Sequence, residues 1–149
     1  MLAVVAAIVV VIDRVTKLYV DHRFGVGYGP RQIVDHVLFL TVTRNAGAAF
    51  GIFQSFTAGF LAISAVIMLG ILIYYWFLPA GDWTARLGLA LVFGGAISNA
   101  YDRAVNGSVI DFIQVPHWPV FNIADSAVTI GVLVLLIGTA LSSRPARRR

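Results

Sequence analysis

Long apolar runs dominate the hydrophobic pattern of this chain. Residues 58–78 and 126–143 contain no charged side chain, and each run is long enough to cross a membrane as a helix. Two shorter apolar runs, 1–12 and 87–101, each continue into a cluster of charged residues. We therefore predict an integral membrane protein, mainly α-helical, with one domain over residues 1–149 and four transmembrane helices at about 1–20, 58–78, 85–102 and 124–143.

Two segments between these runs have the composition of β-strands. Residues 37–43 (VLFLTVT) and 109–115 (VIDFIQV) are rich in β-branched and aromatic residues. A strand edge that faced lipid would leave backbone groups without hydrogen-bond partners, which is energetically costly. We therefore expect the two strands to pair in a small extramembrane β-cradle.

Composition supports a membrane protein and suggests its orientation. The chain is 59% hydrophobic and 12% charged, whereas soluble domains carry roughly a quarter charged residues. Four of its eleven basic residues are arginines in the tail 144–149, which favours a cytoplasmic anchor near anionic lipid over a nucleic-acid groove. An even number of spans then puts both termini in the cytoplasm and the β-cradle on the outward side. The apolar start is expected to be a retained span, because it lacks a basic leader and a small-residue cleavage site.

Two aspartates are the strongest candidates for chemistry. Asp111 lies inside an apolar strand, and Asp125 lies where the last apolar run begins, with a turn rich in proline between them. If the two carboxylates meet, they share one proton, so that one activates a water molecule while the other polarises a carbonyl group. Such an aspartic-peptidase dyad needs no metal and no cofactor.

Each aspartate also has a purely structural interpretation. Asn122 and Asp125 have the spacing of a capping box at the start of a helix, where a carboxylate also suits the helix dipole. Asp111 would be compensated equally well by an ion pair with a nearby arginine. The residues alone leave these interpretations open beside the catalytic one.

Other polar residues suggest a network and a binding segment. Asp13 and Lys17 are four residues apart, so in a helix they share one face and neutralise each other. Arg103 ends the third apolar run and has the chemistry to hold a carbonyl or anionic group of a ligand. The segment 44–51 (RNAGAAFG) is rich in small residues, which let an extended substrate approach, and Asn45 has the groups to bind its backbone.

Metal and thiol chemistry find no support in the residues. The chain contains no cysteine, which excludes disulfides, thiolate ligands and a thiol nucleophile. The three histidines, His22, His36 and His117, have no recognised metal-ligand spacing. We expect them to be solvated loop residues.

Five motifs together resemble one enzyme family. They are DRVTK at 13–17, NAGAAF at 45–50, GGAISNAYDR at 94–103, VIDF at 109–112 and FNIADS at 121–126. In this order they resemble the motifs of lipoprotein signal peptidase (signal peptidase II), and the resemblance covers about residues 13–131. It implies a multi-pass aspartic endopeptidase of the bacterial inner membrane, with its active site toward the outer face. The implied reaction removes the signal peptide from diacylglyceryl prolipoproteins, on the N-terminal side of the lipidated cysteine.

The resemblance also implies residue roles and partners. It assigns Asp111 and Asp125 to the catalytic dyad, and it excludes Asp102. Six residues are expected to bind substrate or stabilise the site: Asn45, Gly47, Asn99, Arg103, Asn122 and Ala124. Three more form a structural polar network: Asp13, Lys17 and Asp102. The expected partners of a monomeric enzyme are prolipoprotein substrates, membrane lipid and a globomycin-type inhibitor, without a metal, a cofactor or nucleic acid.

Two other functions remain compatible with the residues alone. In a small transporter the same aspartates would form an ion relay, although their positions at a span end and in a strand argue against one. In a membrane scaffold without chemistry, the polar motifs would serve only as helix caps and interfacial anchors.

Overall fold

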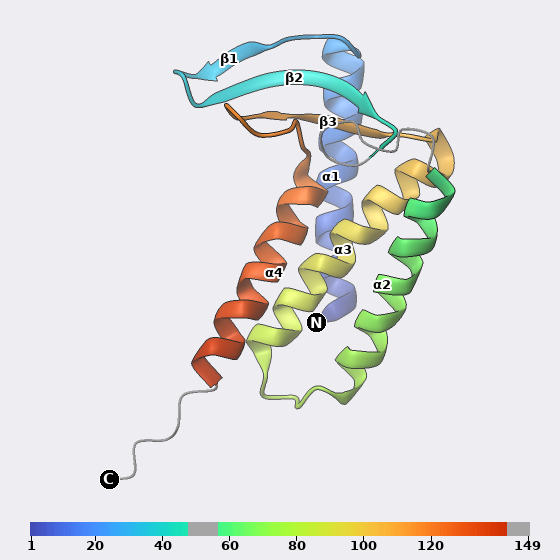
Figure 1. Cartoon of the computed structure of the whole chain (residues 1–149), viewed down its shortest axis with the longest axis vertical. Coiled ribbons are helices and arrows are strands. Elements are labelled where there is room, and N and C mark those ends of the chain that lie inside the picture. Colours follow the sequence, from blue (N-terminus) through green and yellow to red (C-terminus); the bar gives the residue numbers. More distant parts are fainter. Residues whose placement is uncertain (48–56, 143–149) are drawn as a thin grey trace.

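The computed structural model describes residues 1–47 and 57–142, in which long helices stand beneath a small sheet (Figure 1). The helices are α1 (Leu2–Phe24), α2 (Thr57–Phe77), α3 (Trp83–Asn106) and α4 (Ile123–Ser142). The strands are β1 (Arg31–Val34), β2 (Leu38–Asn45) and β3 (Val109–Gln114). The predicted tail 144–149 and the part of the small-residue segment that follows Gly47 lie outside the described residues.

Two of the helices meet a strict criterion for crossing a membrane. They are α2 and residues Ile123–Ala140 of α4, which are long and apolar enough. The middle of α1 carries the charged residues Asp13, Arg14 and Lys17, and α3 is interrupted by polar residues near both ends. The mainly helical fold is confirmed, while the number of four spans stays a prediction.

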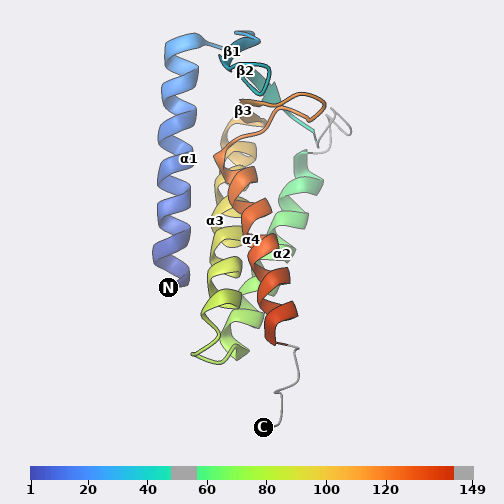
Figure 2. The ribbon, with the colours of Figure 1, turned by 90° about the vertical axis from the view of Figure 1, so that its left-hand side faces the viewer.

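Helix α3 is the central element of the bundle, because it packs against α1, α2 and α4 (Figure 2). Glycines allow these close approaches. A Cβ atom on Gly94 would lie 2.9 Å from the Cα atom of Ala6 in α1. A Cβ atom on either Gly88 or Gly131 would lie 2.7 Å from the carbonyl oxygen of the other, where α3 meets α4. The small residues therefore fix how α3 lies between its neighbours.

The sheet is antiparallel in the order β1-β2-β3 and covers one end of the helices (Figure 1). Both predicted strands are present, with β2 running two residues beyond the expected end at residue 43. Strand β1 was not predicted, because it is short and exposed at every position. A core of Val20, Val42 and Phe112 joins the sheet to the end of α1. The start of α1 and the end of α4 both lie toward the end of the bundle that is away from the sheet, some way apart from each other (Figure 2).

Candidate active site

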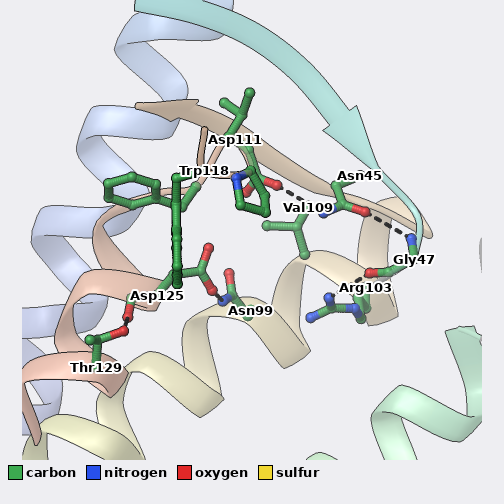
Figure 3. Close-up of a pocket in the computed structure, with 12 residues that line it drawn as sticks. Asn45, Gly47, Asn99, Arg103, Val109, Asp111, Trp118, Asp125 and Thr129 are labelled. Atoms are coloured by element: carbon green, nitrogen blue, oxygen red, sulfur yellow. Dashed lines mark hydrogen bonds between the residues drawn. The ribbon is translucent and has the colours of Figure 1, made fainter. Parts of the chain in front are cut away.

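A pocket of about 310 Å³ lies where β3 meets α3 and α4. Asp111 of β3 and Asp125 in the first turn of α4 both line it, and Figure 3 shows both side chains beside Trp118. The structure therefore brings together the two aspartates that are separated along the chain. The other lining residues come from the end of β2 and the turn after it, from α3, from β3, from the connection between β3 and α4, and from α4: Asn45, Gly47, Asn99, Arg103, Val109, Trp118, Pro119, Val120, Phe121 and Thr129.

The Asp111 carboxylate is held by two neutral amides. Antiparallel pairing sets Thr43 opposite Asp111, which brings Asn45 to the same end of the sheet. Asn45 donates to Asp111 Oδ2 from its Nδ2 atom at 3.0 Å, and Asn122 Nδ2 donates to Oδ1 at 2.7 Å. Among the described residues no arginine forms a salt bridge with Asp111, so the expected alternative of an arginine ion pair is not found there.

The surroundings of Asp111 favour its protonated form. Burial of the side chain, which is only 2% exposed, is the main cause, and the nearby charge of Asp125 adds to it. Together they raise the pKa of Asp111 to about 6, against the opposing effects of the two asparagine bonds and of Lys17. Asp111 therefore exchanges its proton nearer to neutral pH than an ordinary aspartate does.

Asp125 faces the pocket and also caps its own helix. Its Oδ2 atom accepts from the backbone N–H of Asn122 at 3.2 Å, and Asn122 Oδ1 accepts from the backbone N–H of Asp125 at 2.9 Å. This reciprocal pair is the capping box that the spacing indicated. The remaining oxygen, Oδ1, accepts from Asn99 Nδ2 at 2.8 Å. Capping and a place in the pocket are therefore compatible.

Asn122 connects the carboxylates of Asp111 and Asp125 without lining the pocket itself. Its side-chain amide donates to Asp111 and its backbone N–H donates to Asp125, and the residue is fully buried. Ala124, which was expected near the site, is also fully buried and does not line the pocket. Its backbone N–H donates to Asp13 Oδ1 at 2.8 Å, which ties the start of α4 to α1.

Asn99 is oriented by a buried ammonium group. Its Oδ1 atom accepts from Lys17 Nζ at 3.0 Å and from Asn122 Nδ2 at 3.3 Å. With the oxygen occupied by these donors, the amide nitrogen faces Asp125. The lysine on α1 thus acts on the pocket through one asparagine on α3.

A buried ionic cluster lies next to the pocket, between α1 and α3. Lys17 Nζ lies 2.6 Å from Asp13 Oδ2 and 2.7 Å from Asp102 Oδ2. Ser98 Oγ donates to Asp13 at 2.6 Å, and Arg14 forms an ion pair with Asp102. Asp102 belongs to this cluster and does not line the pocket.

Arg103 lines the pocket and is held there by a backbone carbonyl and an aromatic ring. Its Nη2 atom donates to the carbonyl oxygen of Gly47 at 3.2 Å, and its guanidinium carbon lies 5.2 Å from the centre of the Phe60 ring. Within the described part of the chain, its Nε atom is buried without a hydrogen-bond partner. A buried N–H group without a partner is costly unless a ligand accepts from it.

Several residues of the site and its surroundings were not predicted from the sequence. The connection between Asp111 and Asp125 was interpreted only as a turn rich in proline, although its Trp118 and Phe121 both line the pocket. Ser98 lies in a motif that was noted for Asn99, and only the packing of α3 on α1 reveals its bond to Asp13. Among residues 1–47 and 57–142, no group of three acidic, histidine or cysteine residues could hold a metal ion.

Comparisons with known proteins agree on one family. The family model described as signal peptidase (SPase) II matches residues 5–141. The lipoprotein signal peptidase of Brevibacillus brevis is 41% identical over 145 residues, covering 96% of this chain and 97% of the relative. The protein of the same name from Desulfitobacterium hafniense is 39% identical over 142 residues, covering 95% and 93%.

A solved structure supports the same assignment. It is described as a bacterial membrane enzyme, and it superposes with a TM-score of 0.88 at 31% identity, covering 99% of this chain and 93% of the other. The likeness therefore extends over nearly the whole of both chains. This chain belongs to the signal peptidase II family.

Proposed function

We propose that this chain is an aspartic endopeptidase that removes the signal peptide from diacylglyceryl-modified prolipoproteins. It cuts on the N-terminal side of the lipidated cysteine, with Asp111 and Asp125 as the catalytic pair. One observation carries the proposal: the two carboxylates line one pocket, and their hydrogen-bond partners are asparagine amides and a backbone N–H. The names of the related proteins support the class of substrate.

The proposed reaction uses the single proton that the pair shares. The ionised carboxylate takes a proton from a water molecule as its oxygen attacks the scissile carbonyl carbon. The protonated carboxylic acid donates a hydrogen bond to the carbonyl oxygen, and a proton then passes to the leaving nitrogen as the C–N bond breaks. The raised pKa of Asp111, at about 6, supports a pair that retains one proton near neutral pH.

The surrounding residues have supporting roles in this proposal. Asn45, Asn99 and Asn122 orient the carboxylates through the hydrogen bonds described above. The guanidinium group of Arg103, which lines the pocket, is suited to a carbonyl oxygen of the substrate backbone, next to Gly47, whose small size leaves room for an extended chain. Ala124 stabilises the site indirectly, because its backbone holds the first turn of α4 against Asp13.

We also propose that all four helices cross the bacterial inner membrane. The faces of α1 support this arrangement: Asp13 and Lys17 point into the protein, where they are paired. The opposite face is an apolar stripe of side chains that are each 53–64% exposed: Val4, Ile8, Val11, Val15 and Leu18. Both termini then lie in the cytoplasm and the pocket lies toward the outer face of the membrane. The enzyme works as a monomer of one domain, and a globomycin-type inhibitor occupies the pocket.

Cleavage of a lipid-modified substrate tests the proposed function. The purified protein should cut a diacylglyceryl prolipoprotein in detergent, and folded Asp111→Asn and Asp125→Asn variants should each lose at least about 10³-fold in turnover. Asp35→Asn is the matched control, because the side chain of Asp35 is 83% exposed on the β1–β2 hairpin. Failure of the folded parent to cut, or normal turnover in either dyad variant, would contradict the proposal.

A further inference from the structure

A second cavity, of about 280 Å³, adjoins the candidate active site along α4. It is lined by Trp118 and Phe121, which precede α4, and by residues of the first two turns of the helix: Asp125, Ser126, Thr129 and Ile130. Four of these residues also line the pocket that contains Asp111: Trp118, Phe121, Asp125 and Thr129. The two cavities therefore share one wall, in which Trp118 stands beside Asp125 and Thr129 (Figure 3).

The two hydroxyl groups in this second cavity bond to backbone carbonyl oxygens at the start of α4. Ser126 Oγ donates to the carbonyl oxygen of Asn122, and Thr129 Oγ1 donates to that of Asp125, both at 2.9 Å. Both carboxylate oxygens of Asp125 already accept hydrogen bonds. The wall consequently offers aromatic rings, methyl groups and methylene groups, which suit an apolar ligand.

The second cavity opens on the outer side of the bundle. Ile130 is 53% exposed and Trp118 is 65% exposed. Both border α4, which is long and apolar enough to cross a membrane. Tryptophan is enriched at the boundary between lipid and water, where its ring is apolar and its N–H is solvated. The cavity thus opens toward lipid near the end of the helix that carries Asp125.

We propose that this cavity, the acyl groove (Trp118, Phe121, Asp125, Ser126, Thr129 and Ile130), holds one acyl chain of the substrate's diacylglyceryl group. The inference rests on the proposed function, which places the lipid on the residue next to the scissile bond. With a volume of about 280 Å³, the groove is much larger than the space of about 30 Å³ that one water molecule takes in the liquid. It therefore has room for part of one chain, and the second chain stays in the bilayer.

An acyl chain in the acyl groove is expected to orient the scissile bond of the substrate more than it strengthens substrate binding. Lipid tails are about as apolar as the groove, so moving a chain out of the bilayer gains little free energy. The shared wall with Asp125 instead fixes where the lipidated residue lies, and with it the scissile bond. A displacement of about 1 Å in such positioning costs on the order of 10²-fold in rate. The groove is thus expected to act on kcat/KM through the geometry of the reacting groups.

Filling the groove tests the inference. Ile130→Trp places an indole in it, and Ile137→Trp is the matched control, because Ile137 lies two turns farther along α4, is 59% exposed and lines neither cavity. The substrates are synthetic peptides with an S-diacylglyceryl cysteine that carries either hexadecanoyl or butanoyl chains. The ratio of kcat/KM for the long-chain and short-chain peptides should fall at least about tenfold in Ile130→Trp. It should stay at the parent value in Ile137→Trp.

The outcomes separate this inference from the proposed function. If the parent cuts neither peptide, the proposed function fails. If the parent cuts and Ile130→Trp keeps the parent ratio, the acyl groove does not hold a substrate chain. An equal loss on both peptides would also overturn the inference, because it would show a defect unrelated to the chain.

Crosslinking of the unaltered protein provides a test that does not depend on the folding of a variant. A non-cleavable peptide analogue with a diazirine on one acyl chain should label residues 118–130, and an unlabelled hexadecanoyl peptide should compete. Labelling confined to other segments would overturn the inference. The inference would also be overturned if a diazirine phospholipid labelled the same residues equally well and the peptide did not displace it. Bulk lipid would then be the occupant of the groove.

Discussion

Two pairs of aspartates lie side by side in this protein, and they differ in what holds them. Asp13 and Asp102 are bound by cations, since Lys17 contacts both and Arg14 contacts Asp102. Asp111 and Asp125 are bound by the amides of asparagines and by a backbone N–H. Aspartates thus occur in two different environments, the ionic cluster and the pocket, which lie next to each other.

The difference fits a structural role for one pair of aspartates and the proposed chemical role for the other. A cation beside a carboxylate favours its charged form and keeps it there. A neutral amide donor also favours the charged form, but more weakly than a full positive charge does, so the group remains able to gain and lose a proton. The cation-bound pair therefore suits a structural role, and the amide-bound pair suits acid and base catalysis.

The largest predicted effect is the loss of the central cation. Lys17→Met leaves Asp13 facing no cation and removes one of the two that contact Asp102. Removing one partner from a buried ion pair costs about 3–5 kcal/mol. We expect a much lower melting temperature in detergent, measured by thermal unfolding of the purified protein.

Two variants calibrate the Lys17→Met result. Arg23→Met removes an exposed cation near the end of the same helix and should melt like the parent. The double variant Lys17→Met with Asp13→Asn removes a buried charge of each sign and should recover part of the lost stability. An unchanged melting temperature in Lys17→Met would show that the cluster does not stabilise the fold.

A second prediction concerns Asp111, whose substitution should raise the stability of the folded protein, whereas that of Lys17 should lower it. Folding raises its pKa from 3.8 to about 6, so the folded chain binds this proton more tightly than the unfolded chain. The resulting stabilisation is present below pH 4 and is lost as the pH rises through 6. At pH 8, Asp111→Asn removes a buried charge and should stabilise the protein by up to about 3 kcal/mol, since one pKa unit corresponds to ~1.4 kcal/mol. Melting curves between pH 4 and pH 8 measure the effect.

The gain in Asp111→Asn should shrink toward zero at pH 4, where Asp111 is protonated in the parent. Asp35→Asn, which alters an exposed aspartate, should show no such dependence on pH. A gain that is equally large at both ends of the pH range would contradict the assignment to Asp111 ionisation. Stabilisation together with lost turnover would mark Asp111 as a residue kept for function at a cost in stability.

Contacts within one helix could be predicted from the sequence. The spacing of Asp13 and Lys17 indicated their ion pair, and that of Asn122 and Asp125 indicated the capping box, because a helix fixes the geometry of residues three or four apart. The two longer strands were also recognisable, because their β-branched and aromatic residues are dense. Strand β1 has only four residues (RQIV), all exposed, and offers no comparable pattern.

The contacts between elements could not be predicted from spacing. The bonds from Ser98 to Asp13 and from Arg14 to Asp102 depend on how α3 packs against α1. That packing depends in turn on a glycine contact, where Gly94 lies against Ala6. The sequence analysis weighed an arginine or a second aspartate as the partner of Asp111, and the asparagine donors became visible only through the register of β2 on β3 and the position of α4.

The smallest predicted effect is a shift in the pH dependence of cleavage. The bond from Asn45 Nδ2 to Asp111, at 3.0 Å, favours the charged carboxylate and so lowers the pKa of Asp111. Asn45→Ala removes this bond, and the pKa should rise above its value of about 6. Because the proposed reaction needs the pair to retain one proton, the alkaline limb of kcat/KM should move to higher pH by about one unit, as expected for one hydrogen bond to a charged group.

Thr41→Val is the matched control for Asn45→Ala. Thr41 also lies on β2 and bonds across to Gln114 of β3, but it lines no part of the pocket. Its variant should keep the parent pH profile, even if β2 is slightly less stable. A limb that stays in place or moves to lower pH in Asn45→Ala would show that this amide does not control the proton of Asp111. The distinction between amide-bound and cation-bound aspartates would then lose its catalytic meaning at Asp111, and the asparagines would serve only to hold the fold.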